Sequence, residues 1–201
     1  MKKIMSNADR DKESKRNQIL VGVVLILLML FSTVGFAFSF GISGNVVEEI
    51  EYNGIDFAQD PNNGYWTFEV NGKQFYTVYN PEEVAEINFV NPKTVGNYAN
   101  KPLYFVGEAG DSFSELYRTL SEYVLRVGGA CLDDTCEEDY PLKSCGVDNV
   151  VIIEEIFPNE DGEFVGEEEI VTDANCVYIK AKPQNLVRYV DAYLFSLLGI
   201  K

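Results

Sequence analysis

The most pronounced pattern along the chain is an uninterrupted apolar segment near its beginning. Residues 19–41 carry no charged side chain and are predominantly aliphatic and aromatic. About 20 apolar residues, each rising about 1.5 Å in a helix, span a hydrocarbon core of about 30 Å, so we expect a transmembrane helix here. A cleaved signal peptide is the alternative, but its apolar stretch is usually only about 7 to 15 residues long and ends at small residues. Here Phe38 stands between Ala37 and Ser39, which favours an uncleaved anchor.

After residue 50 the pattern changes to short runs of β-branched and aromatic residues separated by turn residues. Residues 65–70 and 73–79 are two such runs, and only Asn71 and Gly72 lie between them. Both turn residues tolerate a positive φ angle, so the pattern predicts a β-hairpin with a type I′ turn. Further apolar runs predict buried strands at residues 102–106, 150–153 and 176–179, with a weaker acidic strand that ends at residue 171.

Two later segments show apolar residues at helical spacing. The first begins near Asp111 or Ser112, either of which can cap a helix, and the glycine pair at 128–129 is expected to end it. Its apolar stripe advances in steps of 4, 3, 4 and 3 through Phe113, Tyr117, Leu120, Val124 and Val127. The second helix is expected over residues 186–197.

The predicted order is a hairpin, a strand, a helix, further strands and a final helix. That order indicates an α+β ectodomain, a mixed α/β sandwich with helices packed on a sheet, following one N-terminal transmembrane helix. We expect four parts: a basic cytoplasmic tail at residues 1–18, the transmembrane helix at 19–41, a linker at 42–49 and an extracytoplasmic α+β domain at 50–201.

Charge is distributed unevenly on the two sides of the apolar segment. Six cations and three anions precede residue 19, which gives 6 − 3 = +3, whereas the rest of the chain carries 10 − 29 = −19. Lys and Arg are retained on the cytoplasmic side of membranes, so we expect a single-pass protein of the cell membrane with its C-terminal domain outside. An acidic domain repels phosphate backbones, and nucleic acid is therefore not an expected partner.

The four cysteines all lie in the part of the chain expected to face outward. An even number of cysteines in an oxidising compartment indicates disulfides, for which three connectivities exist. Cys131 and Cys136 are separated by only four residues, which favours a local bond. The chain between Cys145 and Cys176 is expected to reverse twice, which returns Cys176 towards Cys145. We therefore favour these two pairings.

Two interpretations that give the cysteines a chemical function remain open. A zinc site usually has closely spaced pairs such as C-x-x-C, which this spacing does not resemble. A redox-active Cys131–Cys136 pair is the other, but Asp133 and Asp134 lie between the two thiols and nearby anions oppose thiolate formation. Structural bridges are the preferred interpretation.

Other catalytic signals are sparse. The chain contains no histidine, which excludes Ser-His-Asp and Cys-His catalysis, and it has no P-loop, G-x-S-x-G or G-x-G-x-x-G motif. Two acidic runs stand out, and neither has the alternating Asp or Asn and the Gly of an EF-hand loop, so we expect solvated acidic surface. The runs are Asp133, Asp134, Glu137, Glu138 and Asp139, and residues 167–169.

The predicted hairpin is dense in aromatic residues. They are Tyr65, Trp66, Phe75, Tyr76 and Tyr79. A ligand platform is one interpretation, but aromatic pairs across strands more often build a packed face. We expect a core or an oligomer contact.

The last third of the chain contains three short motifs, NCVYI at residues 175–179, NLVRY at 185–189 and LLGI at 197–200, and Cys145 stands shortly before the strand that starts at Val150. In these features the chain resembles a group of uncharacterised small archaeal single-pass membrane proteins with a cysteine-containing ectodomain. The resemblance covers the apolar anchor and the chain from Cys145 onward. That group has no assigned activity, so the resemblance implies a location and a bridge from Cys145 to the cysteine of NCVYI, and no reaction.

The sequence thus predicts a membrane-anchored extracytoplasmic binding or structural domain, a component of a cell-surface or envelope complex, and not an enzyme. The alternative is a membrane-anchored thiol-disulfide oxidoreductase that uses Cys131 and Cys136. We expect the lipid bilayer as a partner through residues 19–41, together with protein partners or a second copy of the chain, and we expect no cofactor or metal.

Overall fold

The computed structural model describes residues 20–29, 47–89, 92–107, 110–134, 136 and 139–201, and it divides into two units, residues 1–46 and 47–201. In the first unit, residues 20–29 are helical. None of the helices among the described residues has both the length and the apolar character needed to cross a membrane. This finding overturns the transmembrane helix predicted over residues 19–41. The prediction rested on the length of the whole apolar run, whereas the ten helical residues described here rise only about 15 Å.

The remainder of that predicted helix, residues 19 and 30–41, lies outside the described residues, as do the predicted tail and the first part of the predicted linker.

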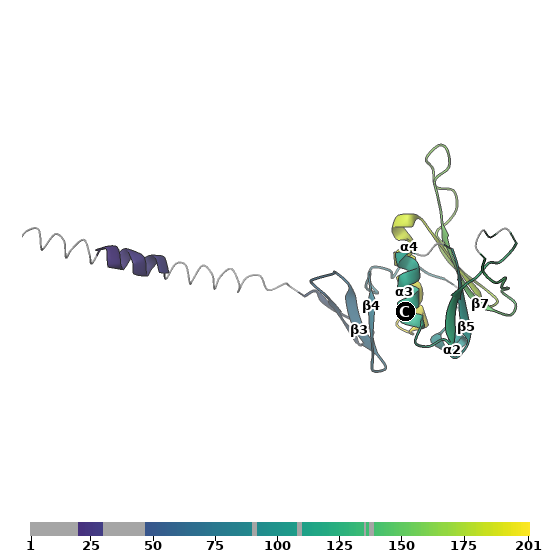
Figure 1. The fold of residues 1–201 in the computed structure, drawn as a ribbon, viewed down its shortest axis with the longest axis horizontal. Coiled ribbons are helices and arrows are strands. Elements are labelled where there is room, and N and C mark those ends of the chain that lie inside the picture. Colours follow the sequence, from purple (N-terminus) through teal and green to yellow (C-terminus); the bar gives the residue numbers. More distant parts are fainter. Residues whose placement is uncertain (1–19, 30–46, 90–91, 108–109, 135, 137–138) are drawn as a thin grey trace, which may run out of the picture. The chain divides into compact units, whose positions relative to one another are not determined.

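The second unit begins with a four-stranded antiparallel meander (Figure 1). Its strands are β1 (Glu49–Tyr52), β2 (Ile55–Gln59), β3 (Trp66–Val70) and β4 (Lys73–Thr77), and they pair in chain order. Asn71 and Gly72 form the β3–β4 turn with φ angles of 53° and 76°. Positive φ at both positions is the requirement of a type I′ turn, so the predicted hairpin is confirmed.

A second, five-stranded sheet has the order β6-β5-β7-β9-β8. All its pairings are parallel except that of β8 with β9. The strands are β5 (Pro102–Val106), β6 (Arg126–Gly129), β7 (Asn149–Glu155), β8 (Glu169–Asp173) and β9 (Cys176–Ala181). The helices of this unit are α2 (Val95–Tyr98), α3 (Asp111–Leu120), the 3₁₀ turn η1 (Pro183–Asn185) and α4 (Leu186–Leu197).

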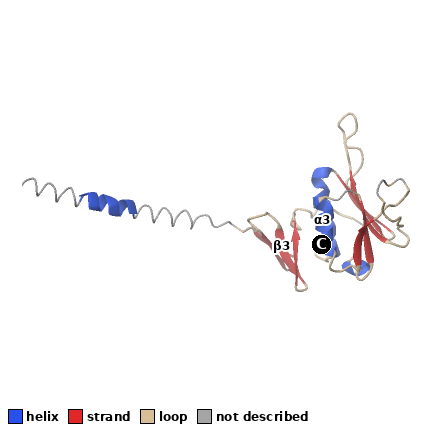
Figure 2. Ribbon diagram, viewed as in Figure 1, coloured by secondary structure: helices blue, strands red, loops and turns tan. Residues whose placement is uncertain are grey.

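Helices α3 and α4 pack against each other and lie between the two sheets (Figure 2). On the meander side, the ring of Phe195 lies 6.0 Å from that of Phe57 and 5.7 Å from that of Phe68. On the other side, Phe113 of α3 contacts Phe105 of β5 at 4.9 Å. Sheets on both sides explain why α4 is buried almost all round. The protein is therefore an α+β fold with two sheets, which corrects the predicted single sandwich behind a membrane helix.

The first predicted helix is also too long. It ends at Leu120, and Arg126–Gly129 forms the edge strand β6 beside β5. The expected stop at the glycine pair is wrong because Gly129 serves a different purpose: a Cβ atom there would lie 2.8 Å from the ring of Tyr140. Local helical spacing continued into a segment whose strand conformation depends on pairing with a distant part of the chain.

Candidate functional site

Both favoured disulfides are present. Cys131 bonds to Cys136, and Cys145 bonds to Cys176. The second bridge ties the segment before β7 to the first residue of β9, where the backbone N–H of Asn175 also donates to the carbonyl of Cys145 at 2.9 Å. This bridge therefore closes the amino-terminal end of the parallel strands.

The surroundings of the small bridge favour a structural role. Only 3% of the surface of Cys131 is exposed, and Cys136 is half-buried. An attacking thiolate needs access to one of the sulfurs, which this burial restricts. Among the residues that the structure describes, no group of three or more Cys, Asp or Glu side chains is placed to hold a metal ion.

The second acidic run is partly structural. The Glu168 carboxylate accepts the backbone N–H of Lys182 and the side-chain amide of Asn185, both at 2.9 Å. It thereby fastens the segment before β8 to the start of α4. In the first run, Asp133, Asp134 and Asp139 are exposed, and residues 137–138 lie outside the described residues.

One face of the aromatic hairpin packs into the hydrophobic core, as expected from the sequence. Trp66 and Phe75 are buried, with Phe68 of the same hairpin, against α4. On the outer face, the guanidinium of Arg118 lies 5.2 Å from the ring of Tyr65 and 5.8 Å from that of Tyr76. One face thus stabilises the fold and the other carries cation–π contacts.

A cleft of about 370 Å³ lies at the carboxyl ends of the parallel strands. Gly107 directly follows β5, Glu155 ends β7, and Pro183 stands two residues beyond β9. The chain leaves β5 through α3 towards β6 on one side, and it leaves β7 towards β8 and β9 on the other. Connections that depart in opposite directions open a crevice between neighbouring strand ends, which is where open α/β sheets bind ligands. We call this the strand-end cleft.

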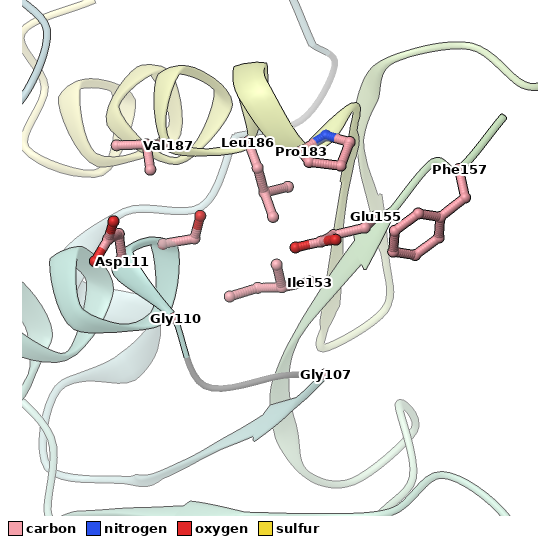
Figure 3. Close-up of a pocket in the computed structure, with 10 residues that line it drawn as sticks. Gly107, Gly110, Asp111, Ile153, Glu155, Phe157, Pro183, Leu186 and Val187 are labelled. Atoms are coloured by element: carbon pink, nitrogen blue, oxygen red, sulfur yellow. The ribbon is translucent and has the colours of Figure 1, made fainter. Parts of the chain in front are cut away.

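The walls of the strand-end cleft come from two helix starts and two strand ends (Figure 3). Asp111 is the first residue of α3, and the sequence-based expectation that it or Ser112 caps the helix is wrong because the N-cap is Gly110. Figure 3 shows the Glu155 carboxylate directed towards Ile153 and Leu186, with Asp111 on the opposite side. The cleft therefore has an apolar floor between two carboxylates.

Gly107 is required at the edge of this cleft. Its φ angle is 113°, and a Cβ atom built there would lie 2.2 Å from the carbonyl oxygen of Ile153. A side chain at this position would push β5 and β7 apart and open the floor of the cleft. The contact explains why a glycine directly follows β5.

Ser112 contributes an accessible hydroxyl to the wall of the cleft. Only 6% of the residue's surface is exposed, but its Oγ is not among the buried oxygens that lack a partner. A hydroxyl that lines a cleft can donate one hydrogen bond to a bound molecule and accept others from it.

Another hollow of equal volume, about 370 Å³, lies between the β3–β4 turn and the last turn of α4. It is lined by Val70, Asn71, Thr94, Val95, Gly96, Tyr123, Leu197, Leu198 and Gly199, none of them charged. Ligand sites combine apolar walls with a few convergent polar groups. The hollow has only the neutral polar side chains of Asn71, Thr94 and Tyr123, whereas the strand-end cleft has two carboxylates and lies at the carboxyl ends of the strands. The strand-end cleft is the stronger candidate.

A buried carboxyl lies outside the cleft. The Asp191 side chain accepts the backbone N–H groups of Val78 and Tyr79 at 3.0 and 2.9 Å, while its Oδ1 has no hydrogen-bond partner. Burial raises the pKa of this carboxyl well above its usual range, the two N–H donors oppose that shift, and the nearby charge of Glu115 adds to it. Burial also raises the pKa of Glu115, against the effect of Arg118. This group fastens the end of the meander to α4.

Sequence reasoning did not identify the strand-end cleft. The signal that was available is the pair Gly107 and Gly110 between a predicted strand and a predicted helix, an arrangement that often opens a helix start towards a ligand. No family model, no curated protein and no solved structure matches this chain. The resemblance to small archaeal membrane proteins therefore stays a prediction.

Proposed function

We propose that residues 47–201 form an extracytoplasmic binding domain, and that the strand-end cleft is its ligand site. The observation that carries the proposal is the position of the cleft at the carboxyl ends of β5 and β7, where the connections diverge. The volume of about 370 Å³ is suited to a small molecule or to one or two side chains of a partner protein. The binding role agrees with the function expected from the sequence, that of a component of a cell-surface or envelope complex.

The location outside the cytoplasm is supported by the cysteines. All four are paired, and disulfides persist in oxidising compartments while cytosolic thiols are kept reduced. Alkylation of intact cells or vesicles followed by mass mapping tests this point. We expect all four cysteines to be protected until a reductant is added, and labelling of any of them without reductant would contradict an oxidising location.

Binding suits the cleft better than catalysis. Its polar side chains are two carboxylates and one hydroxyl, and a serine nucleophile requires an adjacent base such as histidine, which the chain lacks. The thiol chemistry of the alternative function would take place at Cys131 and Cys136, and the burial of Cys131 works against it.

A fragment screen with a matched pair of variants tests the binding role. The full chain is purified in a mild detergent and screened by ligand-observed NMR against small cationic, neutral and anionic fragments. Val187 lines the cleft, and Val187→Trp places an indole in it. The control is Val147→Trp, because Val147 is 81% exposed and does not line the cleft. We expect hits that Val187→Trp abolishes and Val147→Trp preserves. Hits that survive both substitutions, or an absence of hits for the wild-type chain, would overturn the proposal.

A further inference from the structure

The charge of the strand-end cleft restricts what it can hold. Asp111 and Glu155 carry the two carboxylates, and neither forms an ion pair with a cation among the residues that the structure describes. Two uncompensated negative charges raise the local concentration of cations and repel anions. The first turn of a helix has N–H groups without intrahelical partners, and these favour a nearby negative charge. In α3 the carboxylate of Asp111, at the first helical position, already provides that charge, so the helix start does not call for an anionic ligand.

The hydroxyl of Ser112 adds a directional partner. It lies in the wall of the cleft, where its Oγ is not among the buried oxygens that lack a partner and is therefore open to a ligand. A carboxylate accepts hydrogen bonds only, and a serine hydroxyl accepts them through its lone pairs. An ammonium group offers three donors, so it can donate to Glu155 and Ser112 together while Asp111 contributes its field.

The floor of the cleft determines the rest of the ligand. Ile153 and Leu186 are buried beneath it, and Val187 and Pro183 line one side. Phe157, which is 64% exposed, stands at the rim next to Glu155 (Figure 3). A bare metal ion or a strongly hydrated cation gains nothing from such apolar walls, whereas the hydrocarbon part of an organic cation leaves water on contact with them.

We propose that the ligand of the strand-end cleft is an organic ammonium ion with a compact apolar body. Its ammonium group donates to the carboxylate of Glu155 and to the hydroxyl of Ser112, and its apolar body rests on Ile153 and Leu186 below Phe157. The inference rests on the proposed binding function and specifies the ligand class of that same site.

Three probes that share a cyclohexyl ring and differ in their polar group test the ligand class: cyclohexylamine, cyclohexanol and cyclohexanecarboxylate. Their dissociation constants are measured with the full chain in one detergent at constant ionic strength. We expect the amine to bind most tightly and the carboxylate most weakly. Glu155→Gln should weaken the amine about tenfold, because it removes a charged acceptor, and should leave the alcohol unchanged.

The matched control is Glu154→Gln, the neighbouring residue of β7, whose carboxylate pairs with Lys180 at 3.2 Å and does not line the cleft. It should leave binding of the amine unchanged. Both substitutions replace partly or fully exposed side chains, so neither is expected to prevent folding.

The outcomes separate this inference from the proposed function. If the alcohol or the carboxylate binds as tightly as the amine and Val187→Trp abolishes that binding, the ligand class is wrong and the cleft remains a binding site. Equal effects of Glu155→Gln and Glu154→Gln on the amine would likewise overturn the ligand class. If no probe shows binding that depends on Val187, both this inference and the use of the cleft fail.

Discussion

The two disulfides should contribute unequally to stability. We consider two double variants, Cys145→Ala with Cys176→Ala, and Cys131→Ala with Cys136→Ala. The bridged residues are 31 and 5 positions apart in sequence. In the chain-entropy model, a bridge lowers the conformational entropy of the unfolded chain. Loops of these lengths raise the free energy of the unfolded chain by about 3.7 and about 2.1 kcal/mol at 25 °C. The difference in unfolding free energy is therefore expected to be about 1.6 kcal/mol.

The two variants are well matched for other effects. Each bridge joins one buried and one half-buried cysteine, so the loss of packing around the sulfurs is similar and largely cancels in the comparison. Urea unfolding of the full chain in mild detergent measures both losses. The fluorescence of Trp66, the single tryptophan and a buried one, reports the transition. The reasoning is refuted if removal of the short bridge costs as much free energy as removal of the long one.

Two further pairs of variants test a close backbone approach and the buried carboxyl. Gly107→Ala should destabilise the protein by about 1 to 3 kcal/mol, because its Cβ atom meets a backbone carbonyl at a φ angle of 113°. Gly146→Ala, with open space around it and no positive φ angle, should change stability by no more than about 0.5 kcal/mol. Because burial raises the pKa of Asp191, the protonated carboxyl is favoured in the fold, and unfolding free energy should fall as pH rises from the ordinary carboxyl range towards that raised pKa. Asp191→Asn should reduce this slope, to which the raised pKa of Glu115 also contributes, and Asp56→Asn, at an exposed position, should preserve it.

Urea unfolding at fixed pH checks the glycine pair, and equal losses for the two alanine variants would contradict the close approach at β7. A series of unfolding curves between acid and neutral pH checks the carboxyl. If unfolding free energy depends on pH as strongly in Asp191→Asn as in the wild-type chain, the pH dependence belongs to other groups.

Elements set by neighbouring residues were predictable from the sequence. The β3–β4 hairpin follows from Asn71-Gly72, since a two-residue turn with positive φ angles determines the register of its own strands. The helix over residues 186–197 likewise follows from its own apolar periodicity. The pairing of the cysteines was predictable because few connectivities exist and the chain reversals between Cys145 and Cys176 are local turns.

Elements set by distant contacts were not predictable from the sequence. Arg126–Gly129 has too little sequence of its own to reveal a strand, and it becomes one only beside β5. The two-sheet arrangement depends on α4 being buried on both sides, which its strongly apolar composition permits and does not require. The strand-end cleft is assembled from residues near positions 107, 155 and 183, which only the parallel pairing of β5, β7 and β9 brings together.

The location of a bound amine tests the central claim most directly. A map of backbone amide shifts, recorded for the ¹⁵N-labelled full chain during titration with cyclohexylamine, reports where the probe binds. We expect the largest shifts at residues 110–112, 153–157 and 183–187, which surround the strand-end cleft. Shifts confined to the uncharged hollow between the β3–β4 turn and the end of α4, or spread evenly over the surface, would contradict a ligand site at the strand ends.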